Sequence, residues 1–355
     1  PGARISNASV LEATSKTFFV SGAGGSIGAE VTRQLLACNP KKIILYEMSE
    51  YNLFQIEREC FAIIESKDLD TIIIPILGDI RDSNNLNNLF KKYNIDHIYH
   101  AAAYKHVPLV EDENNLAIAA ENNIFGTYNL AKVAVKNNVG SFVMISTDKA
   151  VRPTNIMGAT KRFAEIIIQS INASTDITRF SMVRFGNVIN SSGSVIPLFL
   201  DQISQGGPVT VTDKEVMRYF MTIPEASSLV LQAGEMSIGG EVFILDMGEQ
   251  IKIYDLAKKL IHLSGRNYIE GEGEIDDGIQ ILEVGLRPGE KMFEELLISG
   301  SEITTDNPKI FKANESYIKL DHLQPILKQM EDYIRNYDNA KILNILTENV
   351  EGFER

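Results

Sequence analysis

The chain has 355 residues, with 34 Lys and Arg against 47 Asp and Glu, which gives a formal net charge of −13 at pH 7. This acidic excess argues against the broad basic surface that nucleic acids and anionic membranes require, so we expect neither as a partner. Hydrophobic residues make up 44% and charged residues 23% of the chain, proportions that are typical of a protein with a folded core. The length predicts about two domains.

The number and spacing of the cysteines and histidines indicate the cellular compartment and predict that the chain binds no metal. Cys38 and Cys60 form neither a disulfide framework nor a metal-ligand spacing, which favours a reducing, cytoplasmic location. His100 and His106 are expected to pack rather than to bind metal. No apolar run approaches the roughly 18–20 residues that span a bilayer. Because the chain opens with Pro1 rather than Met, we interpret it as a processed form or a fragment that has lost an upstream segment.

Short β-branched runs alternate with segments of helical length in the first half of the chain, a pattern typical of βαβ units. The intervening amphipathic segments Ser26–Ala37, Tyr51–Ile64 and Asn114–Lys136 are long enough for crossover helices. We therefore predict an α/β fold with a Rossmann-type, doubly wound parallel sheet. The expected strands are Lys16–Gly22, Lys41–Glu47, Thr71–Asp79, His97–Ala103, Ser141–Thr147 and Arg179–Val188.

After about residue 186 the elements become shorter and are separated by Gly and Pro, which indicates a smaller lobe built over the edge of the sheet. Apolar residues at helical spacing after Asp321 predict a helical tail. The expected organisation is an N-terminal arm at 1–15, a dinucleotide-binding domain at 16–186, a substrate-binding lobe at 187–320 and a tail at 321–355.

A glycine-rich run follows the first predicted strand and opens a helix. Its glycines allow a tight turn, close approach of backbone to a pyrophosphate and close packing of helix on strand, while the helix N-terminus faces the phosphate charge. Glu47 ends the next strand 19 residues after Gly28, where a carboxylate hydrogen-bonds the adenosine ribose and repels a 2′-phosphate. This predicts NAD rather than NADP. The expected contacts in the run are Gly22, Gly25, Ser26, Ile27 and Gly28.

Two further segments end consecutive strands, at the sheet edge where open α/β sheets bind ligands. Asp79 and Ile80 follow the third strand, where a carboxylate meets the adenine amino group. Ala101, Ala102 and Ala103 end the fourth strand, where small side chains allow the nicotinamide ribose to approach.

With these segments, Asn123–Thr127 and the helix that carries Lys161, nearly the whole chain resembles an extended short-chain dehydrogenase/reductase. Within that superfamily it looks like the nucleoside-diphosphate-sugar 4,6-dehydratases, above all the bacterial UDP-N-acetylglucosamine 4,6-dehydratases of polysaccharide biosynthesis and protein glycosylation. Four segments together carry this resemblance: Ala103–Pro108, Ser146–Val151, Val183–Val188 and Arg287–Lys291.

The resemblance implies a reaction and a substrate site. The reaction is NAD-dependent dehydration of UDP-N-acetylglucosamine to a UDP-4-keto-6-deoxy-N-acetylhexosamine, with hydride transfer from C4 to C6 and loss of water. The resemblance also implies a homo-oligomer formed through helices that flank the sheet. Arginine suits the diphosphate because its planar donors bind it bidentately. The implied UDP-sugar contacts are Lys105, Asn187, Arg218 and the pair Arg287 and Glu290.

The chain departs from the superfamily at one catalytic position. The usual helix carries Tyr-x-x-x-Lys with both side chains on one face, whereas this chain has Met157 followed by Lys161. Methionine has no ionisable proton, so the usual tyrosinate base is absent, while Lys161 can still hold the nicotinamide ribose. Some long 4,6-dehydratases similarly have Met here, usually behind an N-terminal membrane-spanning region. This chain resembles their soluble catalytic part, which implies the cytoplasmic face of the inner membrane for such a longer protein.

Thr147, Asp148 and Lys149 end the fifth predicted strand and provide an acid and a base side by side. We expect Asp148 to protonate the departing C6 hydroxyl. Lys149 is expected to remove the C5 proton, with a pKa depressed by desolvation or by Lys161. Asp148 or a relay through Thr147 must also take the C4 hydroxyl proton, because tyrosine is absent.

Two other functions compete with this interpretation. A UDP-sugar 4-epimerase would have the same fold and cofactor, but it needs no acid and base for C5 and C6. A non-catalytic nucleotide-sugar-binding protein would explain the missing tyrosine, but it has no chemical reason to keep Asp148, Lys149 and Lys161.

Overall fold

The computed structural model describes residues 13–269, 278–296 and 303–354. The predicted N-terminal arm at 1–15 therefore lies almost wholly outside the described residues.

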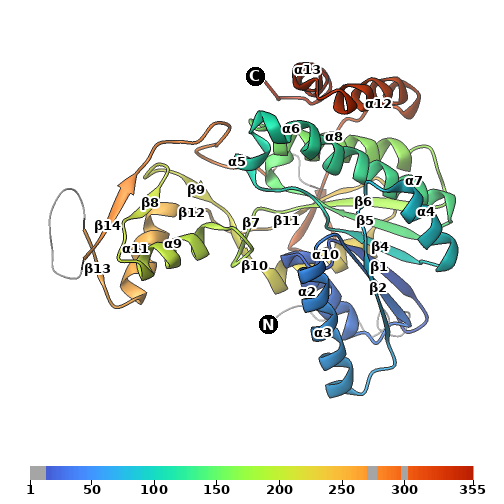
Figure 1. Ribbon diagram of the computed structural model, residues 1–355, viewed down its shortest axis with the longest axis horizontal. Helices are drawn as coiled ribbons and strands as arrows, with labels where there is room; N and C mark the ends of the chain where they lie inside the picture. Colours follow the sequence, from blue (N-terminus) through green and yellow to red (C-terminus); the bar gives the residue numbers. More distant parts are fainter. Residues whose placement is uncertain (1–12, 270–277, 297–302, 355) are drawn as a thin grey trace.

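A nine-stranded sheet forms the centre of the molecule, in the order β15-β16-β11-β6-β5-β4-β1-β2-β3 (Figure 1). The strands from β11 to β3 in this order pair in parallel, and β16 and β15 add antiparallel at one edge. The predicted α/β fold with a doubly wound parallel sheet is confirmed. The bounds are β1 Thr17–Ser21, β2 Lys42–Glu47, β3 Ile72–Leu77, β4 His97–His100, β5 Ser141–Ile145, β6 Arg179–Arg184, β11 Val242–Leu245, β15 Ile303–Thr304 and β16 Ile310–Ala313.

Strand β1 lies between β2 and β4, so the chain winds outward from it in both directions. The carboxyl ends of β1, β2 and β4 therefore meet at the switch point where such sheets bind ligands. Both faces of the sheet are buried, which explains the continuous apolar runs of its strands. Phe19 packs into the core on one face, while Phe18 and Val20 pack into the core on the other, as the alternation of a strand requires.

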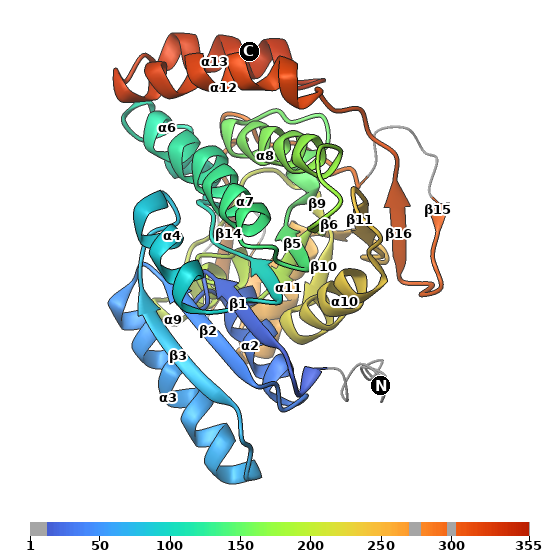
Figure 2. The same cartoon turned by 90° about the vertical axis from the view of Figure 1, so that its right-hand side faces the viewer.

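Helices cover both faces of the sheet (Figure 2). Ser49, Asp82 and Asn155 begin α3, α4 and α8 by accepting backbone N–H groups of the first turn, which satisfies donors that a helix leaves free. One face carries α2 Ser26–Leu36, α3 Glu50–Lys67 and α10 Ile223–Met236. The other carries α4 Ser83–Lys92, α5 Val107–Val110, α6 Glu113–Ala120, α7 Thr127–Lys136 and α8 Ile156–Asn172.

Two predicted elements are interrupted in the structure. The helix expected at Asn114–Lys136 contains a π-helical turn, Glu121–Gly126, between α6 and α7. The side chain of Asn123 in this turn bonds both backbone groups of Tyr104, and such turns often occur at functional sites. The strand expected at Arg179–Val188 ends at Arg184, and a separate strand, β7 Asn187–Ile189, pairs in parallel with β10 Phe220–Thr222.

A smaller lobe extends away from the central sheet (Figure 1). Its three-stranded parallel sheet has the order β13-β14-β8 and packs with α9 and α11 around an apolar core of its own. Part of the range 187–320 returns to the central sheet, because β11, β15 and β16 lie there. The lobe elements are β8 Val209–Val211, β9 Met217–Arg218, β12 Ile251–Lys252, β13 Asn267–Ile269, β14 Gly278–Glu283, α9 Val195–Ser204 and α11 Ile253–Leu263.

The C-terminal tail forms two helices, α12 Leu320–Arg335 and α13 Asn339–Asn349, which pack across α6 and α8 (Figure 2). Leu323, Met330 and Leu346 of the tail are buried in the same core as α8. The tail thus covers a face of α6 and α8 within its own chain. The homo-oligomer expected through helices that flank the sheet stays a prediction. No helix in the described part of the chain is both long and apolar enough to cross a membrane.

A buried ion network joins the tail to the sheet. Arg184 of β6 has no exposed surface and pairs with Glu165 of α8 and with Glu315, which precedes α12. Arg162 pairs with both carboxylates. Attraction to Arg184 and Arg162 outweighs the effect of burial and lowers the pKa of Glu165 to about 2, so these carboxylates depend on the arginines for compensation.

We expect Arg184→Met to lower the free energy of unfolding by about 3–5 kcal/mol, because it leaves buried carboxylates uncompensated. Arg335→Met, which removes an exposed pair with Glu331, should cost about 0.3–0.5 kcal/mol. Urea unfolding of the two variants measures the difference. Equal losses would show that the buried network contributes no more than a surface pair.

Candidate active site

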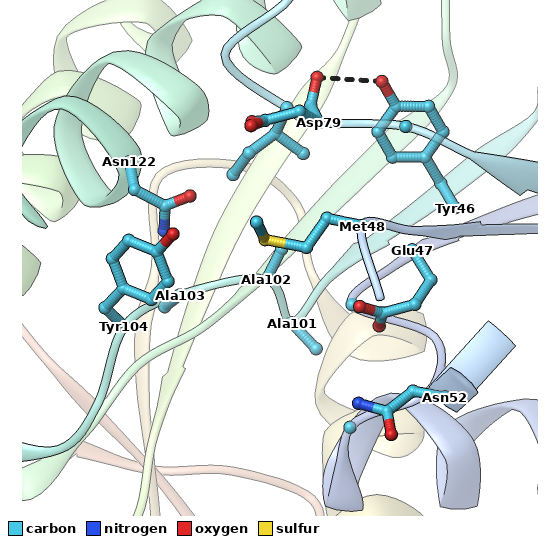
Figure 3. Close-up of a pocket in the computed structure, with 14 residues that line it drawn as sticks. Tyr46, Glu47, Met48, Asn52, Asp79, Ala101, Ala102, Ala103, Tyr104 and Asn122 are labelled. Carbon is cyan, nitrogen blue, oxygen red and sulfur yellow. Dashed lines mark hydrogen bonds between the residues drawn. The ribbon is translucent and has the colours of Figure 1, made fainter. Parts of the chain in front are cut away.

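A pocket opens at the carboxyl ends of β1, β2, β3 and β4 (Figure 3). Its walls include side chains that the sequence analysis did not single out, among them Tyr46, Asn52 and Asn122. Residues from five segments far apart in the sequence thus share one cavity. The predicted cofactor contacts that line it are Gly22, Gly25, Glu47, Asp79, Ile80, Ala101, Ala102 and Ala103.

Steric contacts explain two glycines of the loop before α2. Gly22 has a φ of +65°, and a Cβ there would lie 2.8 Å from the backbone nitrogen of Ala102. A Cβ on Gly28 would lie 2.1 Å from the carbonyl oxygen of Gly22. Gly22 therefore permits the turn against β4, and Gly28 permits α2 to pack against the loop.

Ser26 and Ile27, predicted to contact the cofactor, do not belong to the pocket wall. The Ser26 hydroxyl accepts the backbone N–H of Ser192, and Ile27 packs against the core on the α2 side.

Glu47 is buried, and both of its carboxylate oxygens accept backbone hydrogen bonds. The N–H of Gly24 donates to Oε2 and that of Ser49 to Oε1, each at 3.0 Å. These bonds fix the carboxylate between the glycine-rich loop and the start of α3. Each oxygen retains capacity for a further donor, so Glu47 presents a negative, hydrogen-bonding group to the pocket (Figure 3).

Asp79 is held by a residue that the sequence analysis did not predict. Nε of Arg81 donates to its carboxylate at 2.9 Å, and Arg81 also pairs with Glu121 of the π-helical turn. Burial opposes ionisation, but the bonds from Arg81 outweigh it and lower the pKa of Asp79. Asp79 is therefore a fixed anion, and its backbone oxygen accepts the hydroxyl of Tyr46 (Figure 3).

Lys161 and Met157 lie on α8, in different surroundings. Nζ of Lys161 donates to the carbonyl oxygen of Ile145 at 2.7 Å, and burial lowers its pKa to about 8 although Glu165 opposes the shift. Met157 is 3% exposed and belongs to the apolar core. Position 157 therefore provides packing in this chain.

His100 of β4 contacts both β1 and α7. Its ring bonds the hydroxyls of Ser21 and Thr127, and burial lowers its pKa to about 3. The imidazole is therefore neutral and satisfied within the core.

A second group of predicted site residues lies where β5 ends. Asp148 and Lys149 begin a short 3₁₀ turn, Asp148–Ala150. Oδ1 of the fully buried Asp148 accepts the Thr147 hydroxyl at 2.9 Å and Nζ of Lys149 at 3.0 Å, while its Oδ2 has no partner. Nζ of Lys149 also donates to Asn187 at 3.2 Å. Thr147, Asp148 and Lys149, predicted for catalysis, are thus in contact with one another, and Lys149 also contacts Asn187, predicted for substrate binding.

The expected depressed pKa of Lys149 is wrong. Burial does lower it, but attraction to Asp148 and to Glu294, whose Oε1 lies 3.5 Å from Nζ, outweighs burial and raises the pKa. Lys149 is therefore a cation in the resting protein. No sequence signal marks Glu294, because the adjacent Glu295 is of the same type and instead pairs with Arg152 on the surface.

Arg218, Arg287 and Glu290, all predicted to contact UDP, are linked to one another in the structure. It is Arg218 whose guanidinium pairs with Glu290, at 2.9 Å. Arg287 is exposed and bonds Glu290 through its backbone: its N–H donates to the Glu290 carboxylate at 3.3 Å, and its carbonyl oxygen accepts the Glu290 N–H at 3.0 Å. Desolvation and the charge of Lys149 lower the pKa of Lys105. In the described ranges no group of three His, Cys, Asp or Glu side chains could hold a metal ion.

Comparison with known proteins identifies the family. Residues 18–315 match the model of the polysaccharide biosynthesis protein family. The chain belongs to this family. It is 48% identical over 339 residues to the capsular polysaccharide biosynthesis protein CapD of Staphylococcus aureus, covering 94% of this chain and 53% of CapD. The chain therefore spans about half the length of that relative.

Relatives with named activities and a solved structure show the same superfamily. A UDP-N-acetylglucosamine 4,6-dehydratase (inverting) of Campylobacter jejuni is 32% identical over 309 residues, covering 86% of this chain and 84% of the enzyme. A UDP-glucose 4-epimerase of Rickettsia bellii is 32% identical over 286 residues, covering 80% and 78%. The crystal structure of Pen from Bacillus thuringiensis has a TM-score of 0.74 and 33% identity, covering 90% of this chain and 98% of Pen. The resemblance to extended short-chain dehydrogenase/reductases of nucleotide-sugar metabolism is confirmed.

We expect Gly28→Ala to lower the free energy of unfolding by about 1–3 kcal/mol, the usual cost of overpacking, because the new Cβ meets rigid backbone. Gly25→Ala is the matched control in the same loop, since a Cβ there would lie 3.3 Å from the nearest atom, the oxygen of Gly22. Thermal unfolding compares the two. If both variants were equally stable, the close packing of α2 on the loop would not constrain position 28.

Proposed function

We propose that the protein catalyses the NAD-dependent 4,6-dehydration of UDP-N-acetylglucosamine to a UDP-4-keto-6-deoxy-N-acetylhexosamine, as an early step in bacterial glycan biosynthesis. The observation that carries this proposal is the ion pair of the buried Asp148 with Lys149 at the end of β5, because dehydration needs an acid and a base at C5 and C6 and a 4-epimerase does not. The 4,6-dehydratase among the relatives supports it.

The pocket residues fit a dinucleotide. The loop at Gly22 and Gly25 leaves backbone open to a diphosphate, and the fixed carboxylate of Glu47 favours a free 2′-hydroxyl over a 2′-phosphate. Asp79 suits the adenine amino group, and the small side chains of Ala101–Ala103 leave room for the nicotinamide ribose, which Lys161 would hold. When bound, NAD supplies the hydride acceptor for C4 and the hydride donor for C6.

Asp148 accounts for the proton that tyrosine usually accepts. Its Oδ2 is buried without a partner, so it has an open site for the C4 hydroxyl proton. Once protonated, Asp148 is the acid that the departing C6 hydroxyl needs. The proton taken from O4 thus leaves with O6 as water, and one carboxylate serves both steps without a phenol at position 157. Thr147 donates to the other oxygen and orients the group.

The lobe would bind the nucleotide. Asn187 and Arg218 lie next to Lys149 and Glu294, so a diphosphate held by Arg218 would bring the sugar to the catalytic pair. Two exposed cations suit the charge of the substrate: Lys105, whose pKa is lowered by desolvation and by the charge of Lys149, and Arg287, whose backbone bonds Glu290, the partner of Arg218.

A UDP-sugar 4-epimerase is the second candidate, because a relative of equal identity carries that name. Epimerisation uses the same cofactor and the C4 proton path, but it leaves Lys149 and its carboxylates without a task at C5 and C6. A non-catalytic nucleotide-sugar-binding protein is a weaker candidate. Burying these charged groups costs free energy, and such a protein would have no reaction for them to serve.

Incubation with UDP-N-acetylglucosamine in deuterated water should give a product that has lost one water and gained one deuterium at C5, with no net change in nicotinamide absorbance. Lys149 exchanges its protons with solvent, which is why the label enters at C5. Mass spectrometry and NMR of the nucleotide sugar measure this outcome. A 4-epimer formed without loss of water would identify an epimerase.

We expect Asp148→Asn and Lys149→Ala each to lower turnover by about 10²–10⁴-fold, as for the loss of a positioned acid or base, with UDP binding largely kept. Met157→Tyr should not increase turnover, because position 157 lies in the apolar core. Steady-state rates and UDP titrations test both statements. A tenfold acceleration by Met157→Tyr, together with an active Asp148→Asn, would indicate a weakened tyrosine-type enzyme instead.

A further inference from the structure

Glu294 carries a buried carboxylate to which the proposed reaction assigns no proton transfer. Its side chain is 3% exposed, and its Oε1 lies 3.5 Å from Nζ of Lys149 and 3.9 Å from Nε of Arg218. Its Oε2 is buried without a partner. The side chain of Gln250 donates to the backbone oxygen of Glu294 and fixes the segment. A buried, incompletely bonded carboxylate costs free energy, so its position calls for an explanation.

Charged groups from several elements face Lys149. Asp148 lies on its own turn, Glu294 and Arg218 belong to the segments from the lobe, and Lys105 follows β4. The amide of Asn187 completes the surroundings from β7. The two carboxylates hold Lys149 protonated, and an ammonium group cannot accept the C5 proton. Lys149 must therefore lose a proton before it acts as the base.

Asp148 cannot take that proton, because by then it carries the proton from the C4 hydroxyl and must keep it for O6. The elimination thus needs a third ionisable group within reach of Nζ. Glu294 meets this need: its Oε1 already faces the ammonium group, and its Oε2 is free of other donors.

We propose that Glu294 is a positioning residue that accepts the surplus proton of the Lys149 ammonium group before the C5 proton is removed and returns it afterwards. This inference rests on the proposed dehydratase function. It assigns to a lobe residue the task of making Lys149 a base.

The protons and electrons of the scheme balance. An N–H bond of Lys149 breaks and an O–H bond forms on Glu294, which leaves a lone pair on Nζ. That lone pair takes the C5 proton, the C5–H electrons form the C5=C6 double bond, and the C6–O bond breaks as Asp148 protonates O6. When hydride returns to C6, Lys149 gives a proton to C5 and Glu294 returns its proton to Lys149. All three groups then regain their resting charges.

Glu294→Gln tests this step, with Glu295→Gln as the matched control on the adjacent surface. C4 oxidation needs Asp148 but not Glu294, so in single-turnover mixing the absorbance of reduced nicotinamide should rise and persist in Glu294→Gln. Steady-state turnover should fall at least about tenfold. The control should behave like wild type, and Glu294→Asp should recover part of the rate.

The pH dependence separates this role from a structural one. In Glu294→Gln, Lys149 must lose its proton to solvent, so turnover should rise about tenfold for each pH unit until the pKa of Lys149 is reached, whereas wild type should be nearly independent of pH there. Loss of the neighbouring negative charge also lowers the pKa of Lys149. Acetic anhydride should therefore acylate Lys149 at lower pH in Glu294→Gln than in wild type, as peptide mass spectrometry would show without any turnover.

Three results would overturn the inference. The first is a Glu294→Gln variant with the pH dependence of wild type and no persistent reduced nicotinamide. The second is equal turnover and equal pH dependence in Glu294→Gln and Glu295→Gln. The third is an unchanged pH dependence of Lys149 acylation. Wild-type protein that removes no water from the substrate would instead overturn the proposed function, and this inference with it, so the two failures are distinguishable.

Discussion

The ammonium group of Lys149, held between two buried carboxylates, is the interaction on which the active-site end of the molecule depends. It joins the turn after β5 to β7 through Asn187 and to a segment from the lobe through Glu294. Charges removed from water must be compensated at close range, so these contacts determine where the lobe segment can pack. The same constraint gives Lys149 its raised pKa and leaves an oxygen of each carboxylate open for proton transfer.

A second ion network contacts the segment that follows β5. The hydroxyl of Ser146, next to Thr147, donates to Glu165 at 2.6 Å, and Glu165 pairs with Arg184 on the neighbouring strand. Glu165 also opposes the effect of burial on Lys161, one helical turn away. Helix α8 therefore carries both the structural charges of Arg162 and Glu165 and Lys161, the lysine that we propose to hold the cofactor, while Met157 fills apolar space at the start of the helix.

Local sequence patterns predicted most of the central sheet, because buried parallel strands are continuous apolar runs. They also predicted most of the pocket, because the carboxyl ends of these strands lie at one edge of the sheet. Strands β11 and β16 were not predicted: each is short, and they join the sheet only through distant pairing. The π-helical turn was not predicted, and the contact that accompanies it, between Asn123 and Tyr104, joins residues 19 apart in the sequence. The pKa of Lys149 was predicted with the wrong sign for a similar reason, because it depends on a distant residue. The sequence offers no means to distinguish Glu294, which faces Lys149, from Glu295, which pairs with Arg152 on the surface.

We propose that hydride moves within one sugar from C4 to C6, with proton transfers by Asp148, Lys149 and Glu294 and without a tyrosine. UDP-N-acetylglucosamine that carries deuterium at C4 tests this most directly. After incubation with the protein, NMR should locate the deuterium at C6 of a 4-keto-6-deoxy product. Deuterium that stays at C4 of an intact or epimerised sugar, or that is lost to solvent, would contradict the account.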